Sequence, residues 1–367
     1  MPRLPPWLLQ KAKQQSPDLA ALLPACRDLA SARTEFRWLK EHAQTKALSK
    51  STSPSNQALV RAHRDAHLSR LCRQRGRGVP LQYLLGSQPF GDLDIKCRPG
   101  VLIPRPETEA SVCHLVDLMK KGKLLSPNPS LRHEGLNIVD FCTGTGCIPL
   151  LLFSSLQPSR RRLTVLGIDV ATDVLQLAQE NLRHNEKLGV IKPLSCEQSL
   201  RFARADVFDD GHVQAMTGTR WDVLVSNPPY VSQHVWDFGH GQLAYSVRKY
   251  EPKLALVPAD DIAVPVGWRR EDVFYSRLLD IAILLKTKVV WLELGDEAQA
   301  RRVLAGFATR LLAEKSTVEV WRDWPDLTPA PGENGYLNIT TGPGQEWAVP
   351  VKGAGQIRSI FLQMVVE

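Results

Sequence analysis

Short apolar runs that alternate with helical stretches constrain the fold more than any other feature of this sequence. After residue 135, four such runs are rich in Val, Ile or Leu, as expected for strands buried on both faces of a sheet. They are Leu136–Phe141, Thr164–Asp169, Trp221–Ser226 and Val289–Leu294. Between the second and third runs, apolar residues recur at helical spacing after Thr172, a suitable N-cap. The alternation predicts an α/β fold with a parallel, doubly wound sheet.

The C-terminal part departs from this alternation. Val318–Trp324 and Gln356–Leu362 both have strand character, and no helical stretch separates them. We expect them to form an antiparallel hairpin on the edge of the sheet. Residues 325–355 between them are expected to be an excursion rich in Pro and Gly.

The first 80 residues carry the positive charge of the chain. They hold 15 Lys and Arg against 5 Asp and Glu, whereas the net charge of the whole chain is +8. We expect helices over residues 19–48 and 57–75, separated by the polar loop Ser49–Asn56, and therefore a small basic helical domain over residues 1–80. The charge favours a polyanionic neighbour such as RNA, or an import signal, although a solvated helical face would look the same.

The start of the chain has the character of a targeting segment. Arg3, Lys11 and Lys13 precede the first acidic residue, Asp18. Early basic charge without acid is compatible with a mitochondrial transit segment, although the prolines among the first six residues disfavour a helix interior there. We therefore expect a mitochondrial location, with the cytoplasm as the alternative.

Length and composition exclude several classes of protein. At about 150 residues per domain, 367 residues make roughly two to two and a half domains. The apolar runs are much shorter than the about 20 residues that a membrane-spanning helix needs. The seven cysteines are scattered without a CxxC pair, which argues against a disulfide framework and a closed zinc site. We expect a reducing compartment, no bound metal and no membrane partner.

The first candidate site is the turn Asp140-Phe-Cys-Thr-Gly-Thr-Gly146, which follows a predicted strand and precedes a predicted helix. Glycines in such a turn let a ligand approach the backbone, and a helix N-terminus favours polar or anionic groups. The candidate cofactor-binding residues of this turn are Asp140, Cys142, Thr143, Gly144, Thr145 and Gly146. A lone GxG is a weak signal, and a plain strand–helix turn stays open as the alternative.

Two acidic residues point to a nucleoside-type ligand. Asp169 ends the second predicted strand, 23 residues after Gly146, where a carboxylate can accept hydrogen bonds from both ribose hydroxyls. Asp206 precedes the third predicted strand, and its carboxylate is expected to take an adenine amino group while Val207 covers the ring. Taken alone, either acid would be an ordinary loop or cap residue.

The most specific candidate site is Asn227-Pro-Pro-Tyr230, directly after the third predicted strand. Pro228 and Pro229 lack amide donors and fix the turn, so carbonyl oxygens remain as acceptors at the edge where open α/β sheets bind ligands. Asn227 adds an acceptor and Tyr230 a flat apolar face. This cluster can hold a planar NH2 group and aim its nitrogen. A plain proline turn is the alternative.

We call Asn227–Tyr230 the clamp, because it can hold an NH2 group. A nucleoside site beside this clamp suggests methyl transfer from S-adenosyl-L-methionine, with S-adenosyl-L-homocysteine as the product. The protein then contributes mainly proximity and alignment, worth up to about 7–11 kcal/mol. Neither a metal nor a nucleophilic side chain is required, in agreement with the absence of zinc-ligand spacing and of a GxSxG motif.

In these motifs the chain resembles the HemK/PrmC family, which methylates the glutamine side-chain amide in peptide-chain release factors. The resemblance extends over residues 80–325 and looks like the fungal mitochondrial branch. Besides the glycine turn and Asn227–Tyr230, it is carried by Pro80–Gly86, Val101–Glu109 and Tyr250–Leu256. Cys142 stands where the family has glycine, so the first turn is expected to be shifted or tighter. Residues 259–271 and 325–355 look like insertions.

The resemblance implies a class I, Rossmann-like methyltransferase domain over residues 111–367. A linker over residues 81–110, with a β-hairpin and the Pro104–Glu109 motif, would join it to the helical domain. The glutamine of a Gly-Gly-Gln tripeptide in a class I release factor would be held by Asn227 and Pro228, with Tyr230 packing nearby and Arg105 shaping the floor of the slot. The implied donor-binding residues are Thr143–Gly146, Asp169 and Asp206. For Arg105, Glu107 and Glu109, a structural salt-bridge cluster is an equal alternative.

Two other functions stay open at this point. An adenine amino-group methyltransferase acting on DNA or RNA also has a planar NH2 target, and it would need to extrude a base into its pocket. A non-catalytic adapter could keep the fold without the activity. The Pro104–Glu109 motif favours the glutamine family over both.

Overall fold

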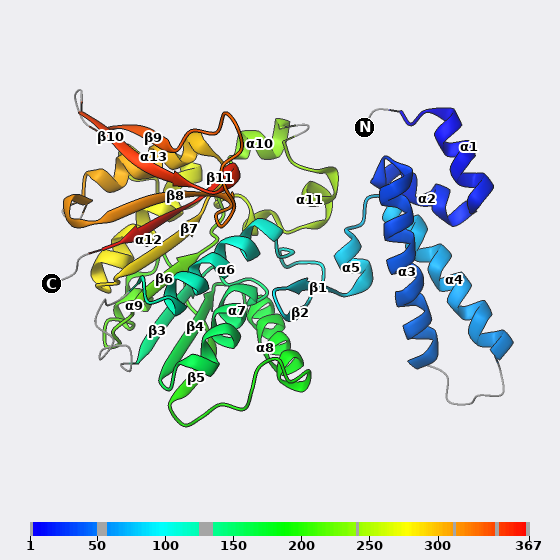
Figure 1. Ribbon diagram of the computed structural model, residues 1–367, viewed down its shortest axis with the longest axis horizontal. Coiled ribbons are helices and arrows are strands. Elements are labelled where there is room, and N and C mark those ends of the chain that lie inside the picture. Colours follow the sequence, from blue (N-terminus) through cyan, green and yellow to red (C-terminus); the bar gives the residue numbers. More distant parts are fainter. Residues whose placement is uncertain are drawn as a thin grey trace. The chain divides into compact units, whose positions relative to one another are not determined.

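The computed structural model (Figure 1) describes most of the chain and divides it into two compact units. The described residues are 3–49, 57–124, 135–239, 242–310, 313–341 and 345–364. One unit comprises Met1–Gln88, Cys97–Pro99 and Leu243–Glu251. The other comprises Pro89–Lys96, Gly100–Gln242 and Pro252–Glu367. The boundaries expected at residues 80 and 110 stay a prediction.

The first unit is helical around its own apolar core. Its helices are α1 (Pro6–Gln15), α2 (Pro17–Cys26), α3 (Leu29–Ser49), α4 (Gln57–Gly76), α5 (Leu81–Leu85) and α11 (Tyr245–Tyr250). Leu22, Leu23 and Leu39 are fully buried in that core. Pro6 and Pro17 each open a helix in the first turn, where the missing N–H has no intrahelical acceptor. Early prolines therefore start α1 rather than prevent it.

The helix predicted over residues 57–75 is confirmed as α4, but the single helix over 19–48 was wrong. The chain breaks between α2 and α3 because Arg27 takes a left-handed φ of 69°. The Asp28 carboxylate then accepts a hydrogen bond from Ser31 N at 2.8 Å and opens α3. Of the predicted loop 49–56, Ser49 ends α3 and the rest lies outside the described residues.

The second unit is built on a nine-stranded sheet, counted over the described residues, with the order β5-β4-β3-β6-β7-β11-β8-β10-β9. Its first five strands in that order are parallel, and β11 runs antiparallel between β7 and β8. The bounds are β3 (Leu136–Phe141), β4 (Leu163–Asp169), β5 (Gln198–Arg204), β6 (Val223–Ser226), β7 (Val289–Glu293), β8 (Thr317–Trp324), β9 (Tyr336–Thr341), β10 (Gln345–Lys352) and β11 (Ala354–Gln363).

The four predicted inner strands and the antiparallel pairing of β8 with β11 are confirmed. The prediction that this pair forms the edge was wrong. Residues 325–355 contain β9 and β10, and β10 adds to β8 in parallel, so the sheet ends at β9. β5 was not predicted from the sequence: among the described strands it pairs only with β4, and it carries charged residues among its apolar ones.

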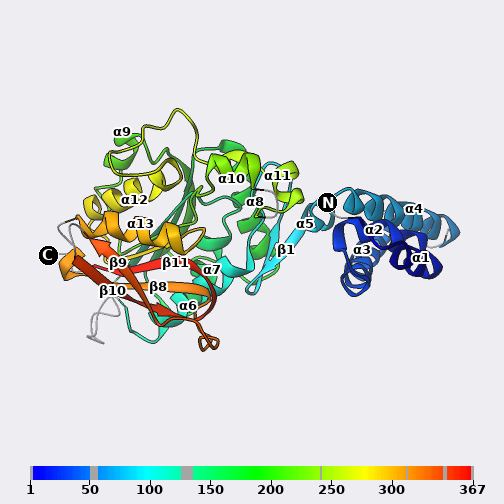
Figure 2. The same cartoon turned by 90° about the horizontal axis from the view of Figure 1, so that it is seen from above.

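Helices cover both faces of this sheet (Figures 1 and 2). On one face the apolar core includes Leu115, Phe153 and Trp291, and on the other Tyr275, Leu292 and Phe307. The helices of the first face are α6 (Pro106–Lys120), α7 (Cys147–Leu156) and α8 (Thr172–Lys187). The second face carries α9 (Asp210–Gln214), α12 (Val273–Leu284) and α13 (Glu297–Ala308). The doubly wound architecture is therefore confirmed.

The remaining elements are short. They are the strands β1 (Ser87–Phe90) and β2 (Leu93–Lys96), the helix α10 (Gln233–Phe238) and the 3-10 turns Gln157–Ser159, Lys253–Ala255, Arg270–Asp272 and Ala313–Lys315. The strands β1 and β2 form a separate two-stranded sheet. The linker with a β-hairpin expected over residues 81–110 stays a prediction. Thr172 is the first residue of α8 rather than its N-cap, which is Ala171.

Candidate functional site

The glycine turn and the Asn227–Tyr230 motif lie side by side because β3 and β6 are neighbouring parallel strands. Phe141 at the end of β3 is paired in register with Ser226 at the end of β6. The Ser226 hydroxyl donates to the Phe141 carbonyl oxygen at 2.7 Å and ties the two strand ends together. The residues that follow each strand therefore leave the same edge of the sheet, as the sequence predicts.

The glycine turn depends on left-handed backbone. Cys142, Gly144 and Gly146 have φ of 60°, 56° and 78°. A Cβ on Gly146 would lie 3.0 Å from Ala178 and Phe202, so packing requires glycine there. A Cβ on Gly144 would meet nothing within 4 Å. The backbone at Gly144 is thus the part of the turn that a ligand can approach.

Two carboxylates lie at this turn. Asp140 is fully buried; its Oδ2 accepts from Thr143 Oγ1 at 2.6 Å, whereas its Oδ1 has no hydrogen-bond partner among the described residues. Asp169 Oδ2 accepts from Gly144 N at 3.0 Å. Burial raises the pKa of both carboxyl groups, against the hydrogen bonds that oppose it. An unpartnered buried carboxylate oxygen is suited to a ligand that donates hydrogen bonds.

The segment around Asp206 starts beside Asp169. Ala205 N donates to the Asp169 carbonyl oxygen at 3.2 Å, and Asp206 Oδ1 accepts from Phe208 N at 2.9 Å. Val207 is buried, and its carbonyl oxygen accepts from Arg277 Nε at 2.6 Å. The structure therefore brings the predicted Asp206 and Val207 to the carboxyl end of the sheet next to the glycine turn.

Asn181, which was not predicted from the sequence, supports the turn from α8. Its Nδ2 donates to the Thr145 carbonyl oxygen at 2.9 Å, and its Oδ1 accepts from Lys96 N of β2 at 2.7 Å. Asn185, one helical turn on, pairs with Asp94 of the same strand through both backbone groups. A buried Asn on an otherwise amphipathic helix face was the available signal, but its partners are distant in sequence.

The clamp residues are linked to two further side chains. Asn227 Nδ2 donates to Thr108 Oγ1 at 3.4 Å, and Thr108 Oγ1 donates to Glu293 Oε2 at 2.5 Å. The Tyr230 hydroxyl lies 3.5 Å from Glu293 Oε1. Pro228 and Pro229, which stand between Asn227 and Tyr230 in the sequence, are both buried. Thr108 stands within the Pro104–Glu109 motif, and Glu293 is a carboxylate in an otherwise apolar strand, yet neither was singled out from the sequence.

Electrostatics at the clamp centre on Glu293. Burial raises the pKa of Glu293 to about 7, while the hydrogen bond from Thr108 and the positive charges of Arg358 and Arg105 oppose the rise. Burial and the Glu293 charge also raise the pKa of the Tyr230 hydroxyl, so this hydroxyl keeps its proton. Arg105, the N-cap residue of α6, thus acts on the clamp electrostatically.

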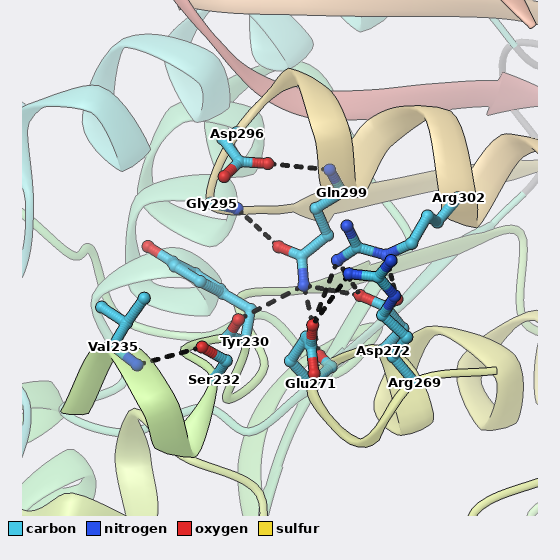
Figure 3. Close-up of polar contacts among 10 residues, drawn as sticks. All are labelled: Tyr230, Ser232, Val235, Arg269, Glu271, Asp272, Gly295, Asp296, Gln299 and Arg302. Atoms are coloured by element: carbon cyan, nitrogen blue, oxygen red, sulfur yellow. Dashed lines mark hydrogen bonds and ion pairs between the residues drawn. The ribbon is translucent and has the colours of Figure 1, made fainter. Parts of the chain in front are cut away.

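A second polar network holds the backbone of Tyr230 (Figure 3). Buried Gln299 on α13 donates from Nε2 to the Tyr230 carbonyl oxygen at 3.3 Å and to Asp272 Oδ1 at 2.9 Å, while its Oε1 accepts from Gly295 N at 2.8 Å. Arg302 closes the network with two hydrogen bonds to Asp272. The Tyr230 ring points away from Gln299 in this view, so the network fixes its backbone rather than its ring.

The residues present fit a nucleoside-type methyl donor. The space at Gly144, the unpartnered oxygen of Asp140 and the adjacent Asp169 and Asp206 offer acceptors and backbone access at one edge of the sheet. Among the residues that the structure describes, no group of three or more His, Cys, Asp or Glu is placed to hold a metal ion. No described helix has the length and apolar character to span a membrane.

Curated proteins show extended similarity to this chain, although no protein-family model matches it. The mitochondrial MRF1 N(5)-glutamine methyltransferase MTQ1 of Saccharomyces cerevisiae is 35% identical over 258 residues, which are 70% of this chain and 68% of that protein. A release factor glutamine methyltransferase of Chlorobaculum tepidum is 36% identical over 259 residues, 70% of this chain and 74% of that protein. The chain belongs to the release factor glutamine methyltransferase family.

Membership of the release factor glutamine methyltransferase family agrees with the topology. The fold is that of class I S-adenosyl-L-methionine-dependent methyltransferases, the chain is an enzyme of that kind, and S-adenosyl-L-methionine is its cofactor. A solved structure of the hMettl16 catalytic domain in complex with MAT2A 3'UTR hairpin 1 aligns with 81% of this chain and 83% of its own, at 14% identity and a TM-score of 0.44. That likeness is too distant to bear on substrate.

Proposed function

We propose that this enzyme methylates the side-chain amide nitrogen of the glutamine in the Gly-Gly-Gln motif of a class I peptide-chain release factor, and so supports translation termination. The observation that carries the proposal is the placement of Asn227 beside the glycine turn, fixed by the Phe141–Ser226 pairing. The acceptor oxygens that would hold the planar NH2 group and the turn that would bind the methyl donor therefore lie together at one edge of the sheet.

The site residues are proposed in two sets. The cofactor would be held by Asp140, Cys142, Thr143, Gly144, Thr145, Gly146, Asp169, Asp206, Val207 and Asn227. The substrate glutamine would be held by Asn227, Pro228, Pro229, Tyr230 and Arg105, with Asn227, Pro228 and Tyr230 closest to the chemistry. The cofactor supplies, when bound, a methyl group on a sulfonium that needs no activation by the protein.

The protein's own task is to bind and orient the amide. An amide nitrogen is a poor nucleophile because its lone pair is delocalised into the carbonyl group. Acceptors on its two hydrogens, the Asn227 oxygen and the Pro228 carbonyl oxygen, increase the electron density on nitrogen and fix its direction. When the nitrogen takes the methyl group, one of these two hydrogens leaves as a proton along its hydrogen bond to solvent, which needs no strong base because a methylated amide nitrogen is highly acidic. Tyr230 keeps its proton and packs beside the amide, which excludes water from the reacting face. Alignment of this kind contributes up to about 7–11 kcal/mol.

We place the activity in mitochondria. The similar yeast protein is named as mitochondrial, and the positive charge of this chain is concentrated in its first 80 residues, as in import segments. Imaging of a C-terminally tagged chain against a mitochondrial marker tests this location, and a diffuse cytoplasmic signal would refute it.

Transfer of labelled methyl groups tests the function. The chain is incubated with radiolabelled S-adenosyl-L-methionine and, separately, a release factor, the same factor with the motif Gln replaced by Ala, DNA, and RNA. Label is expected only in the unaltered release factor. Label in nucleic acid would instead establish an adenine amino-group methyltransferase. Absence of cofactor binding in a calorimetric titration would indicate a non-catalytic adapter.

A further inference from the structure

We propose that Glu293, acting through the Thr108 hydroxyl, sets which way round the side-chain amide of Asn227 lies, so that its oxygen rather than its nitrogen faces the substrate. The inference deepens the proposed function, on which it rests. It makes Glu293 and Thr108 positioning residues for the reaction, because neither is assigned a contact with the reacting atoms.

The direction of each hydrogen bond follows from the groups involved. An ionised carboxylate can only accept, so at 2.5 Å the single hydrogen of the Thr108 hydroxyl points to Glu293 Oε2. Towards Asn227 the Thr108 oxygen is then left with lone pairs alone. It must accept, and the group of Asn227 that can donate is Nδ2, which lies 3.4 Å away. The Asn227 oxygen is thereby turned to the opposite side.

Burial makes this chain of hydrogen bonds, the relay from Glu293 through Thr108 to Asn227, decisive for the orientation of the Asn227 amide. Thr108 and Glu293 are each 1% exposed, so bulk water cannot replace either hydrogen bond. The other carboxylate oxygen, Glu293 Oε1, lies 3.5 Å from the Tyr230 hydroxyl. One buried carboxylate is therefore linked to both polar side chains of the clamp, Asn227 through Thr108 and Tyr230 directly.

Protonation of Glu293 would reverse the relay. A carboxylic acid can donate to the Thr108 oxygen, which releases the Thr108 hydrogen to point at Asn227. The Asn227 oxygen would then face Thr108, and its NH2 group would face the NH2 group of the substrate. Two donors facing each other cannot hydrogen bond, so the clamp would lose its acceptor.

The charge of Glu293 responds to several neighbours. The titratable and charged groups that face it are Arg105 and Glu107 around the start of α6, Tyr230 after β6, Arg358 on β11 and, at its backbone, Tyr275 on α12. Burial places the pKa of the carboxyl group at about 7 against the opposing arginines. The active, ionised form is therefore gained as pH rises, and kcat should increase through an inflection near pH 7.

The decisive variants are a matched pair at Thr108. Thr108→Val keeps the shape of the side chain and removes the hydroxyl, whereas Thr108→Ser keeps the hydroxyl and removes the methyl group. We expect Thr108→Val to lower kcat about 10- to 100-fold, as for the loss of a buried hydrogen bond to a charged group, with cofactor binding largely retained. Thr108→Ser should stay near the wild-type kcat. Equal rates in the two variants would overturn the proposal.

Glu293→Gln tests the carboxylate itself. This variant should have a low kcat at every pH and should lack the inflection near pH 7. An inflection that persists in Glu293→Gln would overturn the assignment of the titration to Glu293. Circular dichroism and calorimetric binding of S-adenosyl-L-methionine establish that each variant is folded.

A readout without substrate separates this inference from the proposed function. In protein labelled with ¹⁵N-asparagine, the side-chain amide signal of Asn227, assigned with Asn227→Ala, should shift with a midpoint near pH 7 in the wild type and not in Glu293→Gln. An Asn227 signal that does not titrate overturns the inference. Failure of the wild type to label a release factor, with the titration present, overturns only the proposed function.

Discussion

Cys142 occupies a backbone conformation that favours glycine. Its φ of 60° costs a residue with a side chain about 1–2 kcal/mol, and the strain lies in the turn that is proposed to hold the cofactor. The resemblance already implied glycine here. The structure supplies the reason, since the chain passes through the left-handed region directly after β3.

Replacement of Cys142 should therefore depend on the shape of the new side chain. Cys142→Gly relieves the left-handed strain and loses a small side chain, so the free energy of unfolding should change by less than about 1 kcal/mol. Cys142→Val adds a β-branched residue at positive φ and should cost more than about 2 kcal/mol. Urea unfolding measures both, and equal stability of the two variants would contradict the strain.

Asn227 should contribute mainly to turnover. Asn227→Ala removes an acceptor that is aligned with the reacting nitrogen, so kcat/KM should fall by the equivalent of about 2–4 kcal/mol. Cofactor binding should remain partly intact because the glycine turn and Asp169 are untouched. Steady-state kinetics and calorimetry provide the two measurements, and a wild-type kcat/KM in the variant would refute the clamp.

Of the individual site residues, those that directly follow a strand could be predicted from the sequence, whereas those that contact one another only through tertiary packing could not. Asn227 and Gly144 were identifiable because each stands at the end of an apolar run. Glu293 was not, because its partner Thr108 is 185 residues away and only the position of α6 against the sheet joins them. Tertiary packing, rather than local pattern, creates that hydrogen bond.

Gln299 couples elements that are separate in sequence. From the first turn of α13 it contacts the segment after β6, the loop before α12 and the residue that follows Leu294. A side-chain amide is suited to this position because its NH2 group donates to two backbone carbonyl oxygens while its oxygen accepts from the backbone N–H of the residue after Leu294.

Gln299→Ala should lower kcat and raise KM together, because Tyr230 loses support for its backbone and the Gly295 amide loses its acceptor. We also expect a loss of about 1–3 kcal/mol of unfolding free energy from the unsatisfied buried groups. Asp296→Ala is the matched control. It removes the N-cap hydrogen bond that Asp296 accepts from the Gln299 backbone N–H and leaves the Gln299 side-chain amide in place, so it should cost about 1 kcal/mol and leave KM unchanged. The same kinetic defect in both variants would rule out a specific role for Gln299.

Elements were predictable where their apolar pattern is continuous. The inner strands β3, β6 and β7 are buried almost throughout, whereas β4 alternates between buried and half-buried positions, and the hydrophobic runs of all four are continuous enough to show them. The strands β5 and β9 lie at the two edges of the sheet, and their exposed positions interrupt the pattern. The break between α2 and α3 depends on one left-handed residue, Arg27, which no periodicity reveals.

For the molecule as a whole, Glu293 opposes stability at neutral and alkaline pH. Its pKa rises from 4.5 to about 7 on folding, so the folded state holds a proton that the unfolded state releases between these values. The free energy of unfolding should therefore fall by about 3 kcal/mol as pH rises through this window, at about 1.4 kcal/mol per unit.

Glu293→Gln should remove this dependence. The variant should be more stable than the wild type at pH 8 and lose most of that advantage at pH 4.5, as measured by urea unfolding at a series of pH values. Glu297→Gln, which alters an exposed carboxylate on α13, should leave the wild-type slope in place. A stability difference independent of pH would contradict the elevated pKa. If Glu293→Gln is more stable than the wild type but less active, the Glu293 carboxyl group lowers the free energy of unfolding and is retained for its role in activity.

The helical unit is discontinuous, since Leu243–Glu251 with α11 belongs to it although more than a hundred residues of the other unit intervene. Tyr245 packs on Gly78, and Tyr250 donates to the Arg77 carbonyl oxygen at 3.3 Å. A chimera that takes only its first 80 residues from a relative would therefore place the relative's residues at positions 77 and 78 against Tyr245 and Tyr250 of this chain. The first 88 residues and the α11 segment, as parts of the same unit, must be exchanged together, and substitutions in one are expected to be matched by substitutions in the other.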